Sequence, residues 1–581
     1  MVHFFMFQRL VLLEKRAPAK AGRTPGCVAT LSATPACRVS LGGIHGNVHS
    51  HKKIMIPVLF YDDFVSMHYA AWRQELPKVS APLLEPRTNL WDADVHAHGT
   101  VLVDPRDGLW KAWYVSTPAT GRQPGSSAET GRLLTYATSK DGIAWVRPNL
   151  DIIKWQGRAS NILLELPHGD FVQYSSVFID ANASNPQPYE MFVLCASQPA
   201  GFEPARCPHR CLYRYHSVDG TRWTPWEIVL GFPEGGTDGL YVFRDEHPSA
   251  SRPRYTAYIK QNLPAPAGGF VPYDIGAGKQ RIIARTISSD GVTWSAPQIV
   301  ATPDWRDAQG DQMVELGVTP VSEGDPSPLI GVFTMIHATS QTIEVQLGAS
   351  RDGVAWWRPT RRAAVPLAAL GDFGGGITWP MRSLVVEPGG RHVHLYFSGT
   401  EGLHASIYDT MPAEAFNACG IGDGRGCWSF RDMRLGGGTV PRGDEQLFAA
   451  VSNNVWFRGA LMRASWPNGR LWGIVPAVGG EVPAEVLTRN LSVPTADARL
   501  IINAATVRNG TLAAEVVVAA TGAVLPGFSM AEAEPFEGDE LDALLRWRGG
   551  RTQIPVGSVP GRCVQVRFSL IRARLYHFAL Q

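Results

Sequence analysis

Charge of one sign, long apolar runs and paired cysteine motifs are all scarce in this sequence. Lysine and arginine number 54 against 52 aspartates and glutamates, which argues against nucleic acid or an anionic membrane surface as the main partner. No apolar run approaches the ~20 residues needed to cross a bilayer, so no membrane span is expected. These two shortages leave neither nucleic acid nor a membrane as the default partner.

Cysteine is sparse, with eight residues in 581. Cys207 and Cys211 enclose a histidine at a ligand-like spacing, but no second pair stands nearby to complete a four-coordinate zinc site. A local disulfide or two free thiols are therefore expected there instead of a metal. Cys419 and Cys427 form the other close pair. No metal and no cofactor are expected elsewhere in the chain.

Aromatic residues, glycine and proline are abundant, with 18 Trp, 15 Tyr, 23 Phe, 59 Gly and 43 Pro. This combination suits short strands and tight turns, and it fits long helices poorly. The length allows two to four ordinary domains, although a propeller of several blades counts as one large domain.

A short pattern, Ser-x-Asp-Gly followed three residues later by Trp, occurs four times. The repeats occupy residues 139–148, 217–225, 288–297 and 350–359. Asp accepts local backbone N–H groups and Gly adopts positive φ, so each repeat predicts a tight hairpin turn, resembling an Asp-box. Such turns would join the two outer strands of a blade, so their carboxylates are not counted among the catalytic candidates. A strand-like run precedes each turn, and a fifth unit without the turn follows at 381–398.

The repeats predict an all-β fold, a five-bladed β-propeller followed by a C-terminal β-sandwich. Alternating apolar runs separated by Gly turns after residue 450 predict the sandwich. The expected division is a disordered or targeting segment at 1–55, the propeller at 56–415, a Gly-rich linker at 416–450 and the sandwich at 451–581. A secretory and a cytoplasmic location both remain open.

The order of these units resembles predicted glycoside hydrolases related to the invertase, levansucrase and arabinanase superfamily. The resemblance runs from about residue 58 to the C-terminus and rests mainly on architecture. The stretches that carry it are Asp62-Asp63, 84–86, 99–105, 111–114, 136–145, 147–150, 343–347, 395–399, His404, 487–489, 501–504, 527–529, 575–576 and Phe578. The Trp-x-Asn-Asp-Pro and Glu-Cys motifs of invertases are absent, so cleavage of sucrose or fructan is not expected.

The resemblance implies a pocket on the propeller axis, lined by the first strand of each blade, with three carboxylates on separate blades. Read at that position, Asp94 is the first candidate for the nucleophile or base, and Asp238 and Asp311 are the other catalytic candidates. A sugar would be held by further residues at the same strand ends. These are Trp91, Asp92, His96, His98, Asp170, Glu315, Trp379 and His404. The alternatives are a solvated loop acid for each carboxylate, a structural role for each His and packing between blades for each Trp.

The sequence thus predicts a glycoside hydrolase or transglycosylase acting on an oligosaccharide or polysaccharide. A non-catalytic carbohydrate-binding propeller is the main alternative, and a propeller that binds protein through its faces is the third. An enzyme needs two acids facing each other across one pocket, whereas a binding module needs only aromatics and amides. The sugar, the linkage and the oligomeric state are not determined by these patterns.

Overall fold

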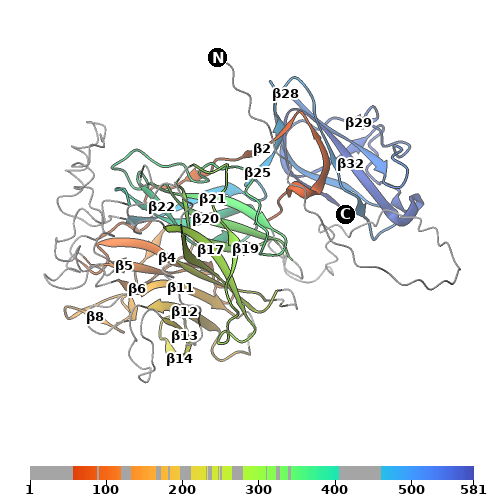
Figure 1. The fold of residues 1–581 in the computed structure, drawn as a ribbon. Coiled ribbons are helices and arrows are strands. Elements are labelled where there is room, and N and C mark those ends of the chain that lie inside the picture. The colour runs from red at the N-terminus through yellow and green to blue at the C-terminus, as the bar shows by residue number, and fades with distance from the viewer. Residues whose placement is uncertain are drawn as a thin grey trace, which may run out of the picture.

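The computed structural model describes residues 56–581 with gaps, so the expected segments 1–55 and 416–450 lie outside the described residues. The gaps are 88–89, 119–131, 165–171, 181–183, 196–210, 230–231, 233–238, 247, 249–251, 265–278, 309, 322–326, 338–339, 341 and 405–458. In the described ranges the regular elements are β-strands and short 3-10 turns, without an α-helix. None of the helical elements in these ranges is long and apolar enough to cross a membrane. The fold is all-β, as the sequence predicts (Figure 1).

The chain from residue 94 to 301 forms three antiparallel sheets, each built mainly from consecutive strands. The first sheet contains β4 (Asp94–Val103), β5 (Trp110–Thr117), β6 (Leu133–Ser139), β7 (Trp145–Val146) and β10 (Ile162–Leu164). The second contains β11 (Val172–Ile179), β12 (Tyr189–Cys195), β13 (Cys211–Ser217) and β14 (Thr224–Val229). The third contains β15 (Leu240–Arg244), β16 (Tyr255–Pro264), β17 (Lys279–Ser288) and β18 (Gln298–Ala301). A small hairpin, β8 (Lys154–Trp155) and β9 (Arg158–Ala159), follows β7.

A fourth sheet of seven strands follows. Its strands, in order across the sheet, are β19 (Gln312–Pro320), β20 (Leu329–His337), β21 (Thr342–Ser350), β22 (Ile377–Val386), β23 (His392–Thr400), β24 (Gly459–Pro467) and β3 (Lys78–Val79). Its two halves meet at one parallel pair, Ile343 with Ile377, whereas the other pairings are antiparallel. The N-terminal strand β3 thus pairs with β24 at the edge of this sheet. Residues 78–79 and 459–467, from the two ends of the chain segment that forms the four sheets, therefore lie side by side.

Five strands meet at the centre of these sheets. β4 contacts β11 and β22, β15 contacts β11 and β19, and β19 contacts β22, which closes a ring. The strands next to them are buried on both faces, as the uninterrupted burial of β12 illustrates. Such strands carry continuous apolar runs because a sheet packs against each face. Side chains at the ends of the five central strands are thereby brought together.

The four Ser-x-Asp-Gly segments form tight turns of one kind, each directly after β6, β13, β17 or β21. In the first, the Gly142 N–H donates to Ser139 Oγ at 3.0 Å, and the next two N–H groups donate to Asp141 Oδ1 at 2.8 Å each. Gly142 has φ +69°, a conformation that glycine adopts without strain. The same bonds recur around Asp219, Asp290 and Asp352.

In three of these turns the glycine carbonyl accepts a hydrogen bond from an aromatic side chain of a neighbouring sheet. The Gly142 carbonyl accepts from the Tyr396 hydroxyl at 2.8 Å. The corresponding pairs are Trp113 Nε1 with the Gly220 carbonyl at 2.7 Å and the Tyr258 hydroxyl with the Gly353 carbonyl at 3.0 Å. The turns therefore hold neighbouring sheets together.

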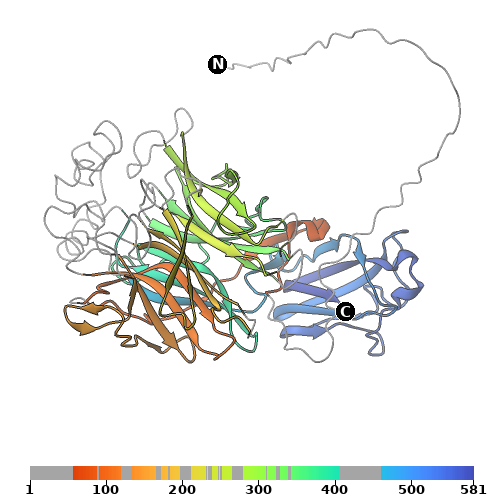
Figure 2. The same cartoon turned by 90° about the horizontal axis from the view of Figure 1, so that it is seen from below.

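The C-terminal strands, drawn in blue in Figure 2, form an eight-stranded curled sheet together with two N-terminal strands, which are drawn in red to orange. Its strands are β1 (Phe64–His68), β2 (Ala70–Gln74), β25 (Trp472–Pro476), β26 (Ala484–Thr488), β27 (Leu491–Ser492), β28 (Leu500–Val518), β30 (Asp539–Leu544) and β32 (Cys563–Leu580). A separate pair is formed by β29 (Ala533–Glu534) and β31 (Arg546–Trp547). Along β32 every second side chain is fully buried at Val564, Val566, Phe568 and Leu570, the period of two expected of a strand with one face in the core.

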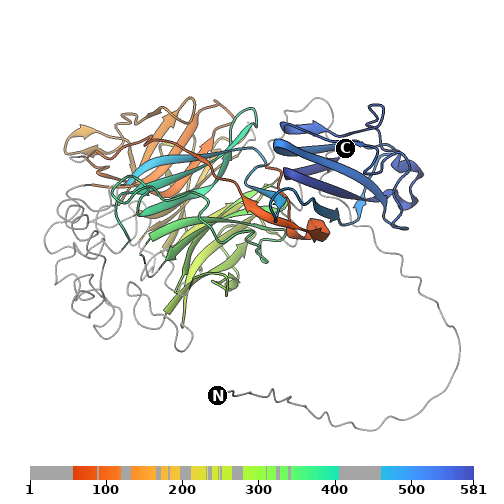
Figure 3. The ribbon, with the colours of Figure 1, turned by 90° about the horizontal axis from the view of Figure 1, so that it is seen from above.

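Two pairings cross the boundaries expected from the sequence. The N-terminal strands β1 and β2 pair with β26 and β25 of the C-terminal sheet, whereas β24 pairs with β23 and lies among the earlier strands (Figure 3). A strand pairs with whichever sheet edge lies next to it in the folded chain, and its position in the sequence does not show which edge that is. The Arg351 guanidinium, on the fourth turn, also binds Asp62 at 2.8 Å and Asp63 at 2.7 Å, which ties this turn to the segment before β1.

Candidate functional site

Strand β4 places three of the predicted residues on one face. Asp94, His96 and His98 are spaced by two, so their side chains share a side of the strand. The pairing of β4 with β5 shifts between His96 and Thr100, and His98 has φ +31°, which marks a bulge. Gly99 permits it, because a Cβ there would lie 2.0 Å from the Trp113 carbonyl oxygen. The sequence His-Ala-His-Gly thus presents two imidazoles at the centre of the ring.

The Asp94 carboxylate is buried and fixed from two sides. The Gly459 N–H, at the start of β24, donates to Oδ1 at 2.9 Å, and His96 Nδ1 lies 3.5 Å from Oδ2. Burial lowers the pKa of His96 below its usual 6.5, although Asp94 opposes the shift. His96 is therefore a neutral imidazole at neutral pH, able to donate or accept a proton.

Glu315 on β19 is the buried acceptor of the same region. Trp379 Nε1 lies 2.8 Å from each of its carboxylate oxygens, and the Tyr174 hydroxyl donates to Oε1. The Thr334 hydroxyl donates at 3.3 Å, and His98 Nε2 lies 3.5 Å from Oε1. A buried carboxylate needs such partners to offset its lost hydration, so Glu315 fixes the rings around it.

The aromatic rings between the two carboxylates form one contact chain. His98 stacks on Tyr174 with centroids 4.2 Å apart and meets Trp379 edge-on at 4.7 Å. His96 meets His98 edge-on at 4.2 Å. Tyr241 on β15 meets Tyr174 edge-on at 5.8 Å, and burial followed by the nearby Glu315 charge raises its pKa well above 10. We call Asp94, His96, His98, Tyr174, Tyr241, Glu315 and Trp379 the central cluster; all five ring strands contribute to it.

Asp311 lies one residue before β19 and is paired with His337. His337 Nδ1 is 2.8 Å from Asp311 Oδ1, and its Nε2 is 3.2 Å from Glu344 Oε2. Burial alone would lower the pKa of His337, but its hydrogen bonds to Asp311 and Glu344 outweigh this and raise the pKa to about 10. His337 is therefore a cation between two carboxylates. The sequence prediction included Asp311 but missed this partner.

The side chains of two predicted residues, Trp91 and Asp92, are bonded to other side chains of this protein. Asp92 is fully buried and lies 2.8 Å from Arg87 Nε and 2.7 Å from Arg147 Nε. Trp91 Nε1 donates to Asn161 Oδ1 at 2.6 Å, and its ring lies under the Arg87 guanidinium. Both side chains thereby support the segment that leads into β4.

The remaining predicted residues are placed in part. His404 is buried shortly after β23. Asp170 and Asp238 lie outside the described residues. Sequence reasoning missed Tyr174 and Tyr241 as members of the site, although each stands near the start of the first strand of its unit, where the other candidates were sought. Cys211 is disulfide-bonded, whereas Cys207 lies outside the described part of the chain.

Within the described ranges, no group of three or more His, Cys, Asp or Glu side chains is arranged to hold a metal ion. The central cluster instead combines carboxylates, neutral imidazole and aromatic faces. Carboxylates serve glycoside hydrolysis, and aromatic faces and imidazoles suit contact with sugar rings and hydroxyls.

No protein-family model matches this chain, and no curated protein matches it. Solved structures do match, and several of them are named as glycoside hydrolases. One is titled a glycoside hydrolase, with 12% identity, a TM-score of 0.38, and coverage of 56% of this chain and 89% of that chain. A thermostable family-43 glycoside hydrolase matches with 11% identity, a TM-score of 0.34, and coverage of 54% and 86%.

An N-acetylgalactosamine deacetylase from F. plautii, solved with a blood group B trisaccharide, also matches. It is 14% identical, with a TM-score of 0.40, and the match covers 69% of this chain and 96% of that chain. At these identities and scores the likeness assigns no activity to this chain.

Proposed function

We propose that this protein is a glycoside hydrolase that cleaves an oligosaccharide or polysaccharide at the central cluster. In this proposal the scaffold is a five-bladed β-propeller with a C-terminal β-sandwich. The closed contacts of the five ring strands support five blades, with the seven-stranded sheet counted as two blades joined at one parallel pair. The units follow 56–415, 416–450 and 451–581, except that β1 and β2 serve the sandwich and β24 serves the last blade.

The observation that carries the proposed chemistry is the position of Asp94. Its carboxylate is held by the Gly459 N–H and lies beside the neutral His96 where the ring strands meet. Glycoside hydrolysis requires one carboxylate that attacks the anomeric carbon or activates water, and one carboxylic acid that protonates the leaving oxygen. A carboxylate oriented by a backbone N–H suits the first role, which we assign to Asp94.

Asp238 and Asp311 complete the proposed catalytic set. Asp311 faces the cationic His337, an arrangement that favours an acceptor and charge-stabilising role over proton donation. We therefore assign the general acid to Asp238, the carboxylic acid expected at the start of β15.

The other predicted residues are assigned to the sugar or to its support. Trp379, His96 and His98 offer an aromatic face and imidazole nitrogens to a sugar, with Glu315 holding Trp379 in place. Asp170 and His404 remain proposed sugar contacts. Trp91 and Asp92 are assigned to the support of β4, since both are engaged with protein partners.

The test is hydrolysis of a panel of aryl glycosides and of plant, algal and bacterial polysaccharides by wild type, Asp94→Asn and Asp238→Asn. Asparagine keeps the acceptor oxygen for the Gly459 N–H, so the fold should be retained. We expect each substitution to reduce kcat by at least about 100-fold. Asp151→Asn, at a side chain 66% exposed, is the matched control and should leave kcat unchanged.

Unchanged turnover in Asp94→Asn would remove Asp94 from the mechanism. No turnover by the wild type on any substrate, with sugar binding equal in all variants, would contradict the hydrolase and leave a carbohydrate-binding protein.

A further inference from the structure

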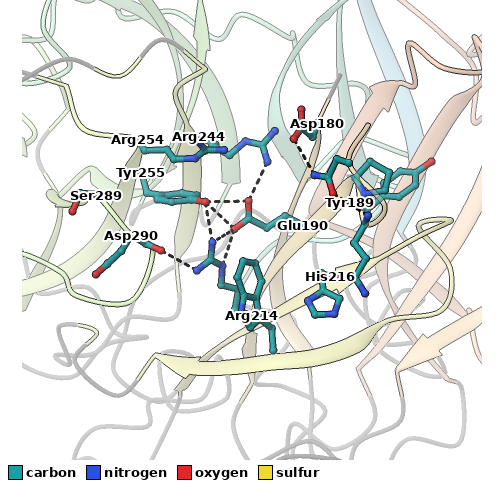
Figure 4. Close-up of a pocket in the computed structure, with 14 residues that line it drawn as sticks. Asp180, Tyr189, Glu190, Arg214, His216, Arg244, Arg254, Tyr255, Ser289 and Asp290 are labelled. Carbon is teal, nitrogen blue, oxygen red and sulfur yellow. Dashed lines mark hydrogen bonds and ion pairs between the residues drawn. The ribbon is translucent and has the colours of Figure 1, made fainter. Parts of the chain in front are cut away.

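A second polar site lies away from the central cluster, between the second and third sheets. It is a pocket of about 580 Å³, bordered by strands β12, β13 and β14 on one side and by residues near β16 and the turn before β18 on the other (Figure 4). Glu190, Arg214, Trp226 and Tyr255 are among the residues that line it. None of these residues was singled out by the sequence patterns.

The pocket lies at the one Ser-x-Asp-Gly turn whose hydrogen bond to the neighbouring sheet does not come from an aromatic side chain. At the other turns the donor is an aromatic side chain on the second strand, such as Tyr396 or Tyr258. In the second sheet that position is Phe192, which has no polar hydrogen. Arg214, directly opposite Phe192 on β13, replaces it and donates to the Asp290 carbonyl at 2.9 Å. Both Arg214 and Asp290 line the pocket, so the departure and the pocket share residues.

The floor of the pocket is a fixed network around Glu190. Arg214 Nε donates to Glu190 Oε1 at 2.7 Å, Arg244 NH1 donates to Oε2 at 3.0 Å, and the Tyr255 hydroxyl donates to Oε1 at 3.0 Å. All four residues are buried. Figure 4 shows their hydrogen bonds converging on Glu190. The network therefore presents a rigid polar surface whose charges are already paired.

One wall of the pocket is an indole. Trp226 on the edge strand β14 is 49% exposed, and the Arg214 guanidinium lies 3.7 Å from its ring centroid. His216 lies against it with centroids 5.5 Å apart. An indole backed by a fixed guanidinium on one face keeps a constant orientation and offers its exposed surface to a ligand.

The lining carries no excess of charge. Three arginines stand against three carboxylates, namely Arg214, Arg244 and Arg254 against Asp180, Glu190 and Asp290. Burial, followed by the nearby Arg214 charge, lowers the pKa of His216, so this imidazole adds no charge at neutral pH. The side chains of Asn185 and Gln187 bring further neutral hydrogen-bonding groups to the pocket. Such a lining suits a neutral ligand with many hydroxyl groups.

We propose that this pocket is a second, non-catalytic carbohydrate site that binds a neutral pyranose unit of a glycan chain. The sugar ring stacks on the exposed surface of Trp226, and its hydroxyls bond the polar lining. The site does not depend on the chemistry proposed for the central cluster, because binding alone is required of it.

The test is affinity gel electrophoresis in soluble xylan and β-mannan, two neutral polymers of pyranose units, with acidic polygalacturonate as the charged comparison. The Asp94→Asn protein is used so that no polymer is cleaved. We expect at least one neutral polymer to retard the protein, equally in low salt and in 0.5 M NaCl, since a neutral sugar makes no screened ion pair. Trp226→Ala should weaken that retardation by about tenfold, and Trp226→Phe less.

Trp305→Ala is the matched control, because Trp305 is 91% exposed and does not line the pocket. Retardation unchanged in Trp226→Ala, absent with every neutral polymer, or confined to polygalacturonate at low salt would refute the inference. Turnover of small aryl glycosides should be equal in wild type and Trp226→Ala. Trp226-dependent retardation without any turnover would refute the hydrolase proposal and support this site. Turnover without Trp226-dependent retardation would support the hydrolase proposal and refute this site.

Discussion

The contact between the Asp-Gly turns and the neighbouring sheet leads to a quantitative prediction at Gly142. A Cβ on Gly142 would lie 2.4 Å from the Tyr396 hydroxyl and 3.0 Å from the Trp110 ring. Gly108 has nearly the same φ, +72° against +69°, but nothing within 4 Å of its Cβ position. Substitution by alanine at Gly108 therefore measures the backbone cost alone, about 1–2 kcal/mol.

Gly142→Ala adds a second cost, because the Tyr396 hydroxyl must move off the Gly142 carbonyl. Tyr396 is fully buried, and a buried polar group that loses its partner costs about 1–3 kcal/mol. We expect Gly142→Ala to lower the free energy of unfolding by about 2 kcal/mol more than Gly108→Ala. Urea unfolding followed by tryptophan fluorescence, with calorimetry as a second probe, measures the difference.

The assignment to Tyr396 is checked by a double-mutant cycle. Tyr396→Phe removes the nearest atom that the new methyl group would meet and leaves the Trp110 ring at 3.0 Å, so Gly142→Ala should cost less in that background than in the wild type, although still more than Gly108→Ala. If Gly142→Ala and Gly108→Ala were equally destabilising, or if Tyr396→Phe left the cost unchanged, the turn would not hold the sheets together as argued.

Two further substitutions test the charge pairs around the site. The pKa of His337 is raised from 6.5 to about 10, so its stabilising contribution is complete below pH 6.5 and is lost as the pH rises through 10. The full shift corresponds to roughly 5 kcal/mol, and because the side chain is 21% exposed we expect about 3 kcal/mol. The difference in unfolding free energy between wild type and His337→Gln should shrink by that amount from pH 6.5 to 10, and a constant difference would contradict the pairing. Asp92→Asn removes the carboxylate between two partly buried arginines and should lower the free energy of unfolding by about 3 kcal/mol, measured by calorimetry. The exposed control Asp151→Asn should lower it by less than about 0.5 kcal/mol. Equal effects of the two substitutions would show that the pairs of Asp92 with the arginines contribute nothing.

The all-β fold and the four turns were predictable because their signals are local. Asp141 and its counterparts bind backbone groups two and three residues away, so the pattern Ser-x-Asp-Gly contains everything that the turn needs. The alternation along β32 is local in the same sense. The partner of each turn is not local, since Tyr396 lies 254 residues from Gly142.

The candidate site divides in the same way. The spacing of Asp94 and His96 on one strand is enough to place them on one face, whereas the position of His98 depends on the bulge that follows His96. Their meeting with Glu315 and Trp379 depends on which strands the ring brings together, and no pattern within β4 contains that information. The pairing of Asp311 with His337 likewise joins residues 26 positions apart, one just before β19 and the other at the end of β20.

By itself, then, the sequence determined the strands, the turns and the side of β4 on which Asp94 and His96 stand, because these follow from hydrogen bonds and periodicity within a few residues. Only the tertiary structure decided that β1 and β2 join the last sheet, that Asp92 is taken by two arginines, and that a pocket opens beside Trp226. These depend on which edges and side chains are left free once the ring has closed.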